Sequence, residues 1–466
     1  MIKKIGIGIL LFVNLTSCIG YKNATPETVE NLKNSSVVKA NIEISDKWIQ
    51  DKAQNQSAFS YEWMNELLTP ELKRLIKEGL THNADIIISK ETLDQVELTM
   101  DIAGSNLYPS VNALANTGNN LISGSHIGKL QLKASWELDL WGKNKSAEMA
   151  SVSRYFSAQF QQKMLEQSIA GMIAKAYYLN IAGQYQEQKI SEYIAKTEEL
   201  KKILIIQNKV GTANALDISN IESESILLNS YLEKIRNANT QSSRSIEILC
   251  GKYPAGLTKV NAKFSALAQH IPTDFPLNIL EKRADIMAKQ FHIESNFYQV
   301  QETKAARLPA LNIGAGFGAA ETNVAGISNL FSNPLIKVGG GITTPIFNNG
   351  KLKKNVEIKT SQQKQAVEEY AKSVLIAFNE VESALANLGS IDKQEIYQQQ
   401  AISSLEKNID LTKKQIKIGS NNSFILLQKQ RDLIKREMNT IDLDLQQRIE
   451  RINLYMALGA NGLVNF

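Results

Sequence analysis

Apolar and polar residues alternate along several short segments of the chain, whereas much longer segments carry apolar residues at every third or fourth position. The clearest alternation lies in residues 130–141, where leucine, alanine and tryptophan hold the even positions. The odd positions hold Gln131, Lys133, Ser135, Glu137 and Asp139. Residues 107–117, 308–319 and 335–347 alternate in a similar way. A period of two predicts strands with two different faces, for which a soluble half-buried sheet is the common setting.

The longer segments predict two exceptionally long helices, over residues 143–208 and 351–416. No proline occurs between Pro109 and Pro254 or after Pro345, so neither helix meets a residue that would kink it. At 1.5 Å per residue, each predicted helix is roughly 100 Å long. Glycine-containing turns, KVGTAN (209–214) and KIGSNN (417–422), follow the two helices, and a second helical run returns from each turn. The pattern therefore predicts two antiparallel helical hairpins.

The two halves of the chain match in register, which indicates an internal duplication. Pro109 and Pro309 stand at equivalent positions of the two strand pairs. Gly142 in the first half corresponds to Gly350 in the second, and Gly211 corresponds to Gly419. We therefore expect two repeats, residues 61–260 and 261–466, each built as helix, two strands and long helical hairpin. Gly142 and Gly350 mark the expected joints between strand and helix.

The first residues predict export and a lipid anchor. Lys3 and Lys4 precede a short apolar run, and Leu15-Thr16-Ser17-Cys18 resembles a bacterial lipobox. We expect residues 1–17 to be a signal peptide, Cys18 to carry lipid, and the polar residues 18–60 to form a tether. Ile19 is not the aspartate that retains many bacterial lipoproteins in the inner membrane, so the expected membrane is the outer one. The other cysteine, Cys250, then has no disulfide partner, and we expect it to be a buried apolar residue.

Charge and motif content give no support to an enzyme or a nucleic-acid-binding protein. The formal charge of +5 falls to about +3 without the signal peptide, too little for so long a chain to indicate nucleic acid. The four histidines lack metal-ligand spacing, and GAGFG (314–318) lacks the strand–turn–helix context of a nucleotide-binding loop. We therefore expect no catalytic residues, no cofactor and no metal.

The four strands have the length that a membrane-spanning strand needs, but they cannot close a barrel alone. Each predicted strand has 11 to 13 residues, close to the roughly 9–11 that a tilted strand needs to cross a bilayer. Open sheet edges are excluded from lipid. If the strands span a bilayer, several chains must pool them. Apolar positions would then face lipid, and Lys133, Glu137, Asp139 and Lys337 would face a water-filled lumen. The alternation points Trp141 inward, but its place at the strand end also suits an interfacial girdle, and this choice stays open.

The sequence resembles the TolC family of outer-membrane factors, in the lipid-anchored branch that serves multidrug and metal efflux. The resemblance lies in the order and spacing of motifs across nearly the whole mature chain: HNADI (82–86), SWELDLWGK (135–143), VGTANALDI (210–218), LCGKYP (249–254), KRADI (282–286), RLPALNI (307–313), TPIFNNGK (344–351), NEVESAL (379–385) and LQKQRDL (427–433). It implies a mixed α and β membrane protein: a homotrimer with a twelve-stranded transmembrane β-barrel and a periplasmic α-barrel of twelve helices.

The resemblance also implies a function and its partners. The chain would be a passive exit duct for small molecules such as drugs or metal ions, docked to a periplasmic adaptor and an inner-membrane pump. Two alternatives remain at this point. One is an outer-membrane duct of a type I protein secretion system, and the other is a lipid-anchored coiled-coil structural protein that conducts nothing. The sequence does not name the cargo.

The resemblance places a gate at the periplasmic turns that contain Gly211 and Gly419. Asp217 matches a family position whose carboxylate joins the closing network. Asn421 replaces the arginine of that network, and Ile425 and Gln428 replace aspartates that ring the constriction. We therefore hypothesise a neutral gate, narrowed by Phe424 or Ile425 and hydrogen-bonded by Gln428.

Overall fold

The computed structural model describes residues 22–40, 48, 66–119, 126–267, 277–321, 335–420 and 422–459. The predicted signal peptide, the predicted lipidation residue Cys18 and the predicted gate residue Asn421 lie outside these ranges. Within them, no helix is both long and apolar enough to cross a membrane.

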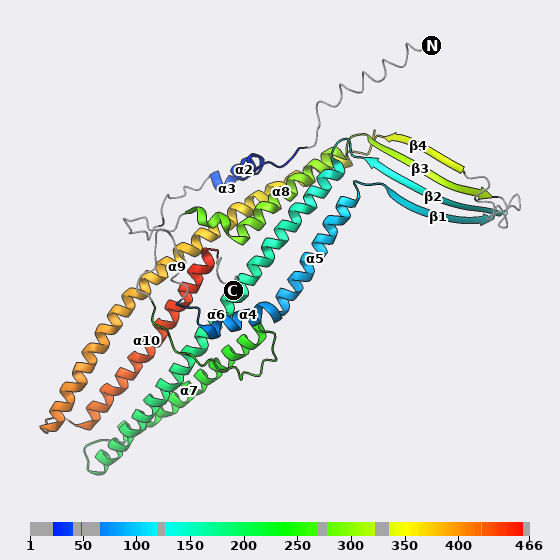
Figure 1. Ribbon diagram of the computed structural model, residues 1–466. Helices are drawn as coiled ribbons and strands as arrows, with labels where there is room; N and C mark the ends of the chain where they lie inside the picture. Colours follow the sequence, from blue (N-terminus) through cyan, green and yellow to red (C-terminus); the bar gives the residue numbers. More distant parts are fainter. Residues whose placement is uncertain are drawn as a thin grey trace, which may run out of the picture. The chain divides into compact units, whose positions relative to one another are not determined.

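The secondary structure occurs in the same order in both halves of the chain (Figure 1). In the first half, α5 (Ala84–Ser105), β1 (Ser110–Asn119), β2 (His126–Leu138), α6 (Lys143–Lys209) and α7 (Ala215–Leu249) follow one another. In the second half, the sequence is α8 (Ala284–Ala305), β3 (Ala310–Glu321), β4 (Leu335–Thr343), α9 (Lys351–Lys417) and α10 (Ser423–Ala457). Corresponding helices have equal lengths of 22, 67 and 35 residues. This equality supports the predicted duplication.

Shorter helices precede these two sets of elements. They are α2 (Pro26–Asn34), α3 (Val37–Ala40), α4 (Pro70–His82) and the 3₁₀ helix η2 (Leu277–Lys282). Pro70 occupies the first turn of α4, where its missing N–H removes no helical hydrogen bond. Thr69 caps the same helix by accepting a hydrogen bond from the Leu72 amide at 3.2 Å.

The chain divides into two compact units, each of which draws on both halves of the sequence. The first consists of Met1–Glu43, Lys90–Gln161 and Asp285–Val374, and it contains the sheet. The second consists of Ile44–Ser89, Gln162–Ala284 and Leu375–Phe466, and it contains the turns of both hairpins.

The four strands form one antiparallel sheet in the order β1-β2-β3-β4 (Figure 1). Two strands end earlier than the alternation predicts. β2 stops at Leu138, where the chain turns toward α6, so the prediction that placed Asp139 within the strand is wrong. β4 stops at Thr343, two residues before Pro345, which has no N–H to extend a ladder.

Side chains of α6 and α8 build a small core in the first unit. Ala150 packs with Phe297 and Tyr298, and Ala24 and Leu32 cover this cluster. The Tyr298 hydroxyl accepts a hydrogen bond from the Ala24 amide at 3.0 Å. Ala24 and Leu32 lie within the predicted tether, so at least this part of it is held against the helices of the unit.

The second unit buries larger apolar side chains around α4, α6 and α7. Tyr178 is fully buried, and its hydroxyl donates a hydrogen bond to the Leu67 carbonyl at 2.6 Å. Cys250 is also buried, with no disulfide partner among the described residues, and burial raises the pKa of its thiol to about 11. The predicted role of Cys250 as a small buried residue is confirmed.

Candidate functional site: the strand sheet and the helix turns

The register of the sheet separates its residues into two chemically different faces. One row across the strands is Asn112, Lys133, Gly316 and Lys337. The neighbouring row, on the opposite face, is Ala113, Leu132, Phe317 and Ile336. Because cross-strand partners point to the same side, polar side chains gather on one face and apolar ones on the other.

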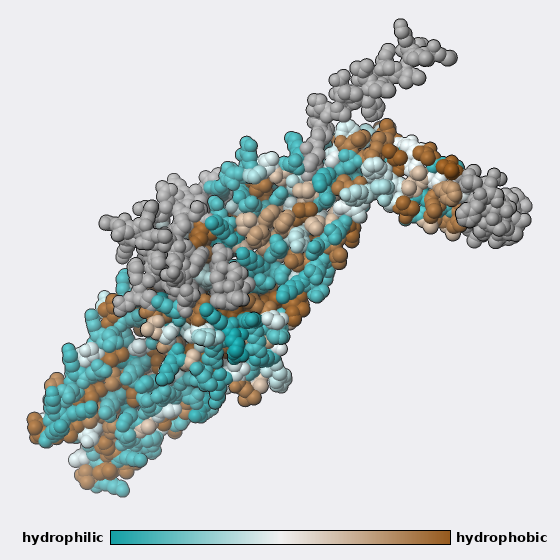
Figure 2. All heavy atoms as spheres, in the orientation of Figure 1, coloured by the Kyte–Doolittle hydropathy of each residue, from teal (hydrophilic) through white to brown (hydrophobic). Residues whose placement is uncertain are grey.

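The apolar face of the sheet is uncovered in the single chain. The exposed fraction is 78% for Val338, 70% for Ile336 and 50% for Leu132. Figure 2 shows hydrophobic residues gathered over the described part of the sheet. A continuous exposed apolar surface of this kind marks contact with lipid or protein rather than with water.

Both edges of the sheet are open. β1 pairs only with β2, and β4 only with β3, within the described residues. Unpaired backbone N–H and C=O groups therefore line the outer sides of β1 and β4 and are available for pairing with another chain.

Two carboxylates predicted to line a lumen are held by the start of α6. Glu137 forms an ion pair with Lys143 at 2.6 Å. Asp139 accepts hydrogen bonds from the backbone amides of Asn144 at 3.1 Å and Lys145 at 2.7 Å. A carboxylate in this position accepts hydrogen bonds from the free N–H groups of the first helical turn, and its charge interacts favourably with the positive end of the helix dipole. Asp139 thus fixes the passage from strand to helix.

The glycines at the predicted joints lie directly before the long helices. Gly142 has φ +69° and Gly350 has φ +76°, a backbone region that favours glycine. The Gly142 carbonyl accepts the Ser146 amide at 2.9 Å, and the Gly350 carbonyl accepts the Lys354 amide at 3.0 Å. Each glycine therefore begins the helical hydrogen-bond ladder while the chain changes direction.

Trp141 lies in the turn between β2 and α6 rather than on the strand. Its indole Nε1 donates a hydrogen bond to the Pro309 carbonyl at 2.7 Å. Trp136, on β2, donates similarly to the Leu107 carbonyl at 3.0 Å. Trp136 thus links β2 to the residues before β1, and Trp141 links the end of β2 to the residues before β3. Alternation alone does not reveal these contacts.

The turns of the two hairpins have the same backbone construction. Gly211 and Gly419 have φ of +77° and +75°. In each turn the next residue's amide reaches back five positions: Thr212 donates to the Gln207 carbonyl at 2.8 Å, and Ser420 to the Gln415 carbonyl at 3.0 Å. This is the Schellman ending of a helix, which glycine permits without strain.

Asp217 acts within its own helix start. Its carboxylate accepts the Asn214 amide at 3.2 Å, while the Asn214 side chain accepts the Asp217 amide at 2.8 Å. Asn422 caps α10 in the corresponding place and accepts the Ile425 amide at 3.2 Å. The predicted contact of Asp217 with neighbouring hairpins stays a prediction.

The three other predicted gate residues on α10 divide between the core and the surface. Phe424 packs against a buried cluster at the hairpin turns that contains Leu200, Leu204, Ile221 and Leu427. Ile425 and Gln428 are exposed. The predicted gating roles of these residues stay predictions.

A buried arginine joins the two hairpins and was not predicted as a site residue. Arg431, on α10, donates a hydrogen bond to the Tyr193 hydroxyl of α6 at 3.1 Å and pairs with Glu224 of α7. The Tyr193 hydroxyl in turn donates to Glu224 at 2.9 Å. Burial works to raise the pKa of Glu224, but the hydrogen bonds from Arg431 and Tyr193 outweigh it and leave that pKa below its usual value. Arg431 lies within LQKQRDL (427–433), one of the motifs on which the family resemblance rests, and this motif is the sequence signal that could have identified it.

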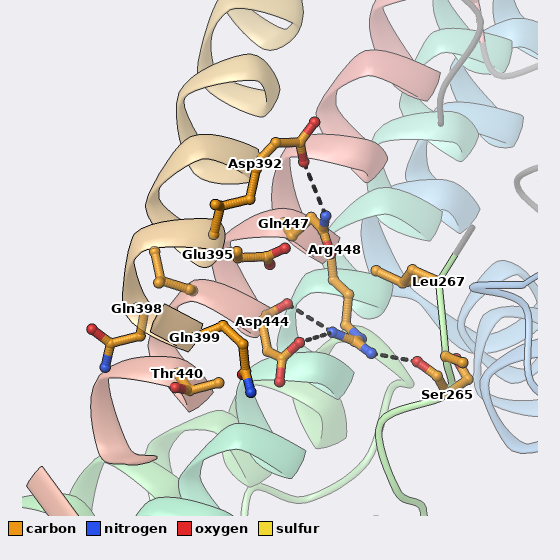
Figure 3. A pocket seen from close by; sticks show the side chains of 13 residues that line it. Ser265, Leu267, Asp392, Glu395, Gln398, Gln399, Thr440, Asp444, Gln447 and Arg448 are labelled. Atoms are coloured by element: carbon orange, nitrogen blue, oxygen red, sulfur yellow. Dashed lines mark hydrogen bonds and ion pairs between the residues drawn. The ribbon is translucent and has the colours of Figure 1, made fainter. Parts of the chain in front are cut away.

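A cavity of about 710 Å³ lies between α9, α10 and residues 265–267 (Figure 3). Arg448 is one of the residues that line the cavity. It donates a hydrogen bond to the Ser265 carbonyl at 2.5 Å and forms an ion pair with Asp444 at 3.3 Å. Burial, and then the charges of Asp444 and Asp392, raise the pKa of Glu395. The described residues contain no group of three or more potential ligands placed to hold a metal ion.

Comparisons with known proteins agree on one family and one fold. The family model described as outer membrane efflux protein matches residues 75–251 and 276–460. The chain is 23% identical over 418 residues to the pyoverdine export outer membrane protein OpmQ of Pseudomonas aeruginosa, covering 85% of this chain and 87% of that one. It is 24% identical over 411 residues to the probable outer membrane lipoprotein SilC of Salmonella typhimurium, with coverages of 85% and 87%.

Solved structures show the same fold at lower identity. The CmeC outer membrane channel of Campylobacter jejuni superposes with a TM-score of 0.77 at 18% identity, covering 91% of this chain and 95% of that one. The predicted mixed fold, with one small sheet and long helical hairpins, is confirmed.

Proposed function

Because the chain belongs to the outer membrane efflux protein family, we propose that it is the outer-membrane exit duct of a tripartite efflux system. The observation that carries this proposal is the sheet, which has one polar face, one exposed apolar face and two open edges. A sheet of this kind suits a wall between lipid and water, once its edges are paired.

The edges are paired by identical neighbours. A membrane-spanning sheet has to close, because lipid offers no hydrogen bonds to free backbone groups. In a homotrimer, β1 of one chain pairs with β4 of the next, and three sheets make one twelve-stranded barrel. The long hairpins α6–α7 and α9–α10 of the three chains continue the duct as a barrel of twelve helices in the periplasm.

The duct itself supplies no energy and carries out no reaction. An inner-membrane pump drives transport, and a periplasmic adaptor docks at the hairpin turns that contain Gly211 and Gly419. Lipid on Cys18 anchors each chain to the outer membrane, in keeping with the similarity to SilC, a probable outer membrane lipoprotein. The name of OpmQ as a pyoverdine export protein supports export of small molecules rather than of whole proteins.

A non-conducting coiled-coil protein is the less favoured reading, because it gives no reason for an apolar sheet face that stays exposed. Insertion into lipid separates the two. We expect the purified mature protein to insert into vesicles, and Ile336→Arg on the apolar face to reduce insertion by tenfold or more, since an arginine on the lipid face costs about 2–4 kcal/mol at the bilayer midplane.

Asn112→Arg on the polar face is the matched control, and it should insert as the wild type does. Equal insertion of the Ile336 variant and the control would contradict the assignment of the two faces. Failure of the wild-type protein to insert at all would contradict the proposed duct.

A further inference from the structure

We infer that the strand-built part of the proposed duct prefers anions, because Lys133 and Lys337 place on the polar face of the sheet two ammonium groups that no described residue pairs. This inference rests on the proposed function, since it requires the polar face to line the passage. It adds the chemical class of ligand that this face takes: small anions, or solutes that carry a carboxylate or phosphate group.

The two lysines flank a glycine in the same row of the sheet. Lys133 is the cross-strand partner of Gly316, and Gly316 is the partner of Lys337. Strands two apart lie roughly 9–10 Å from each other, so the two side chains rise on either side of a strip without a side chain of its own. An anion above Gly316 is within reach of both flexible lysines.

The strip above Gly316 is covered by a hydrogen-bond donor. The Gln131 amide nitrogen lies 2.6 Å from the position that a Cβ on Gly316 would occupy. Any side chain at position 316 would displace this amide. The glycine therefore leaves room for the Gln131 amide on the polar face, between the strands that carry Lys133 and Lys337.

The carboxylates near this row do not neutralise it. Glu137 is paired with Lys143 at 2.6 Å, and Asp139 lies beyond the end of β2, bound to the amides that begin α6. Lys133 and Lys337 are exposed, and neither forms an ion pair with any residue that the structure describes. Among the described side chains of the polar face, the uncompensated charge is therefore positive.

Trimerisation multiplies this charge. Three chains bring six such lysines into one proposed barrel, with two from each chain in a single row of its sheet. Rings of Lys or Arg confer anion selectivity on pores, because a narrow passage with low-dielectric walls concentrates the field of its charges.

Reversal potentials across a planar bilayer test the inference. With purified trimers and a potassium chloride gradient, we expect chloride to be more permeant than potassium. The double variant Lys133→Gln/Lys337→Gln should lower the chloride-to-potassium permeability ratio roughly fivefold. This factor corresponds to the interaction of two unit charges about 4 Å apart in water. The double change to Glu should reverse the preference.

Lys22→Gln provides a control with the same loss of charge, because Lys22 is exposed and lies outside the sheet. It should leave the permeability ratio unchanged. A wild-type channel that conducts but prefers potassium, or a ratio that the double Gln variant does not change, would overturn the inference and leave the duct intact. A protein that does not conduct contradicts the proposed function instead.

Discussion

The Tyr193 hydroxyl of α6 accepts a hydrogen bond from the Arg431 guanidinium of α10 at 3.1 Å, which joins the two helical hairpins through buried side chains. Arg431 also pairs with Glu224 of α7, so three helices meet at this one cation. If the hairpins separate when the duct opens, this connection has to move with them or break.

Arg431→Met removes the cation and leaves the Glu224 carboxylate without its partner. We expect a loss of about 1–3 kcal/mol in the free energy of unfolding, since Glu224 is only partly buried and water replaces some of what it loses. Thermal melting of the helical circular dichroism signal measures this loss. Arg436→Met, at an exposed position of the same helix, should change the melting temperature little. Equal melting of the two variants would show that the connection contributes nothing.

The Glu224 pairing should also depend on pH. The folded-state pKa of Glu224 lies below its ordinary value of 4.5, so the pairing stabilises the fold fully above that value. Its contribution is lost as the pH falls through the lower, folded-state pKa. In melting experiments between pH 7 and pH 3, the difference between wild type and Glu224→Gln should shrink at the acid end. A difference that grows with acid would contradict this assignment.

Replacing the helix-capping carboxylate Asp139 should weaken the start of α6. Asp139→Ala leaves the Asn144 and Lys145 amides without their acceptor, and we expect a loss of about 1 kcal/mol. Asp139→Asn keeps an acceptor oxygen and should lose less. The amides at the start of α6 should exchange hydrogen faster in the alanine variant, and unchanged exchange would argue against the capping role.

Alanine in the hairpin turns should destabilise them through the backbone. Gly419→Ala forces a residue with a Cβ into φ +75°, at a cost of about 1–2 kcal/mol, although no neighbouring atom obstructs the new methyl group. Gly389→Ala, within α9, also meets no neighbouring atom but has ordinary helical geometry, so it should stabilise by up to about 1 kcal/mol. Effects of the same sign in the two variants would contradict the turn geometry.

A neutral gate predicts weak block by divalent cations. Ile425 and Gln428 are exposed and uncharged on α10, so magnesium added to the periplasmic side should reduce the conductance little. The double variant Ile425→Asp/Gln428→Asp introduces the carboxylates that bind such ions, and it should acquire block at lower magnesium concentrations. Strong block of the wild-type protein would refute the neutral gate.

The sequence predicts the large elements of this fold well, for physical reasons that particular residues make clear. The long helices were expected over 143–208 and 351–416, and α6 and α9 each extend one residue further. Proline scarcity and apolar spacing are local signals, and Gly211 and Gly419 mark the turns with equal clarity. The two faces of the sheet also follow from alternation alone.

Other features depend on partners that are distant along the chain or on backbone geometry, and they could not be predicted. The strand-like pattern continues past Leu138, but the Asp139 carboxylate binds the amides of α6 and ends the strand. Trp141 finds its acceptor at Pro309, which is 168 positions away. Arg431 and Tyr193 are 238 positions apart, so no local pattern reveals their contact.

The central claim is that the sheets of three identical chains close into one conducting barrel. The most direct test is to measure the single-channel conductance of the purified mature protein in a planar bilayer, with the mass of the inserted particle determined on the same preparation. We predict discrete conductance steps from particles of three chains. Monomers without conductance, or trimers that bind lipid but never conduct, would contradict the account.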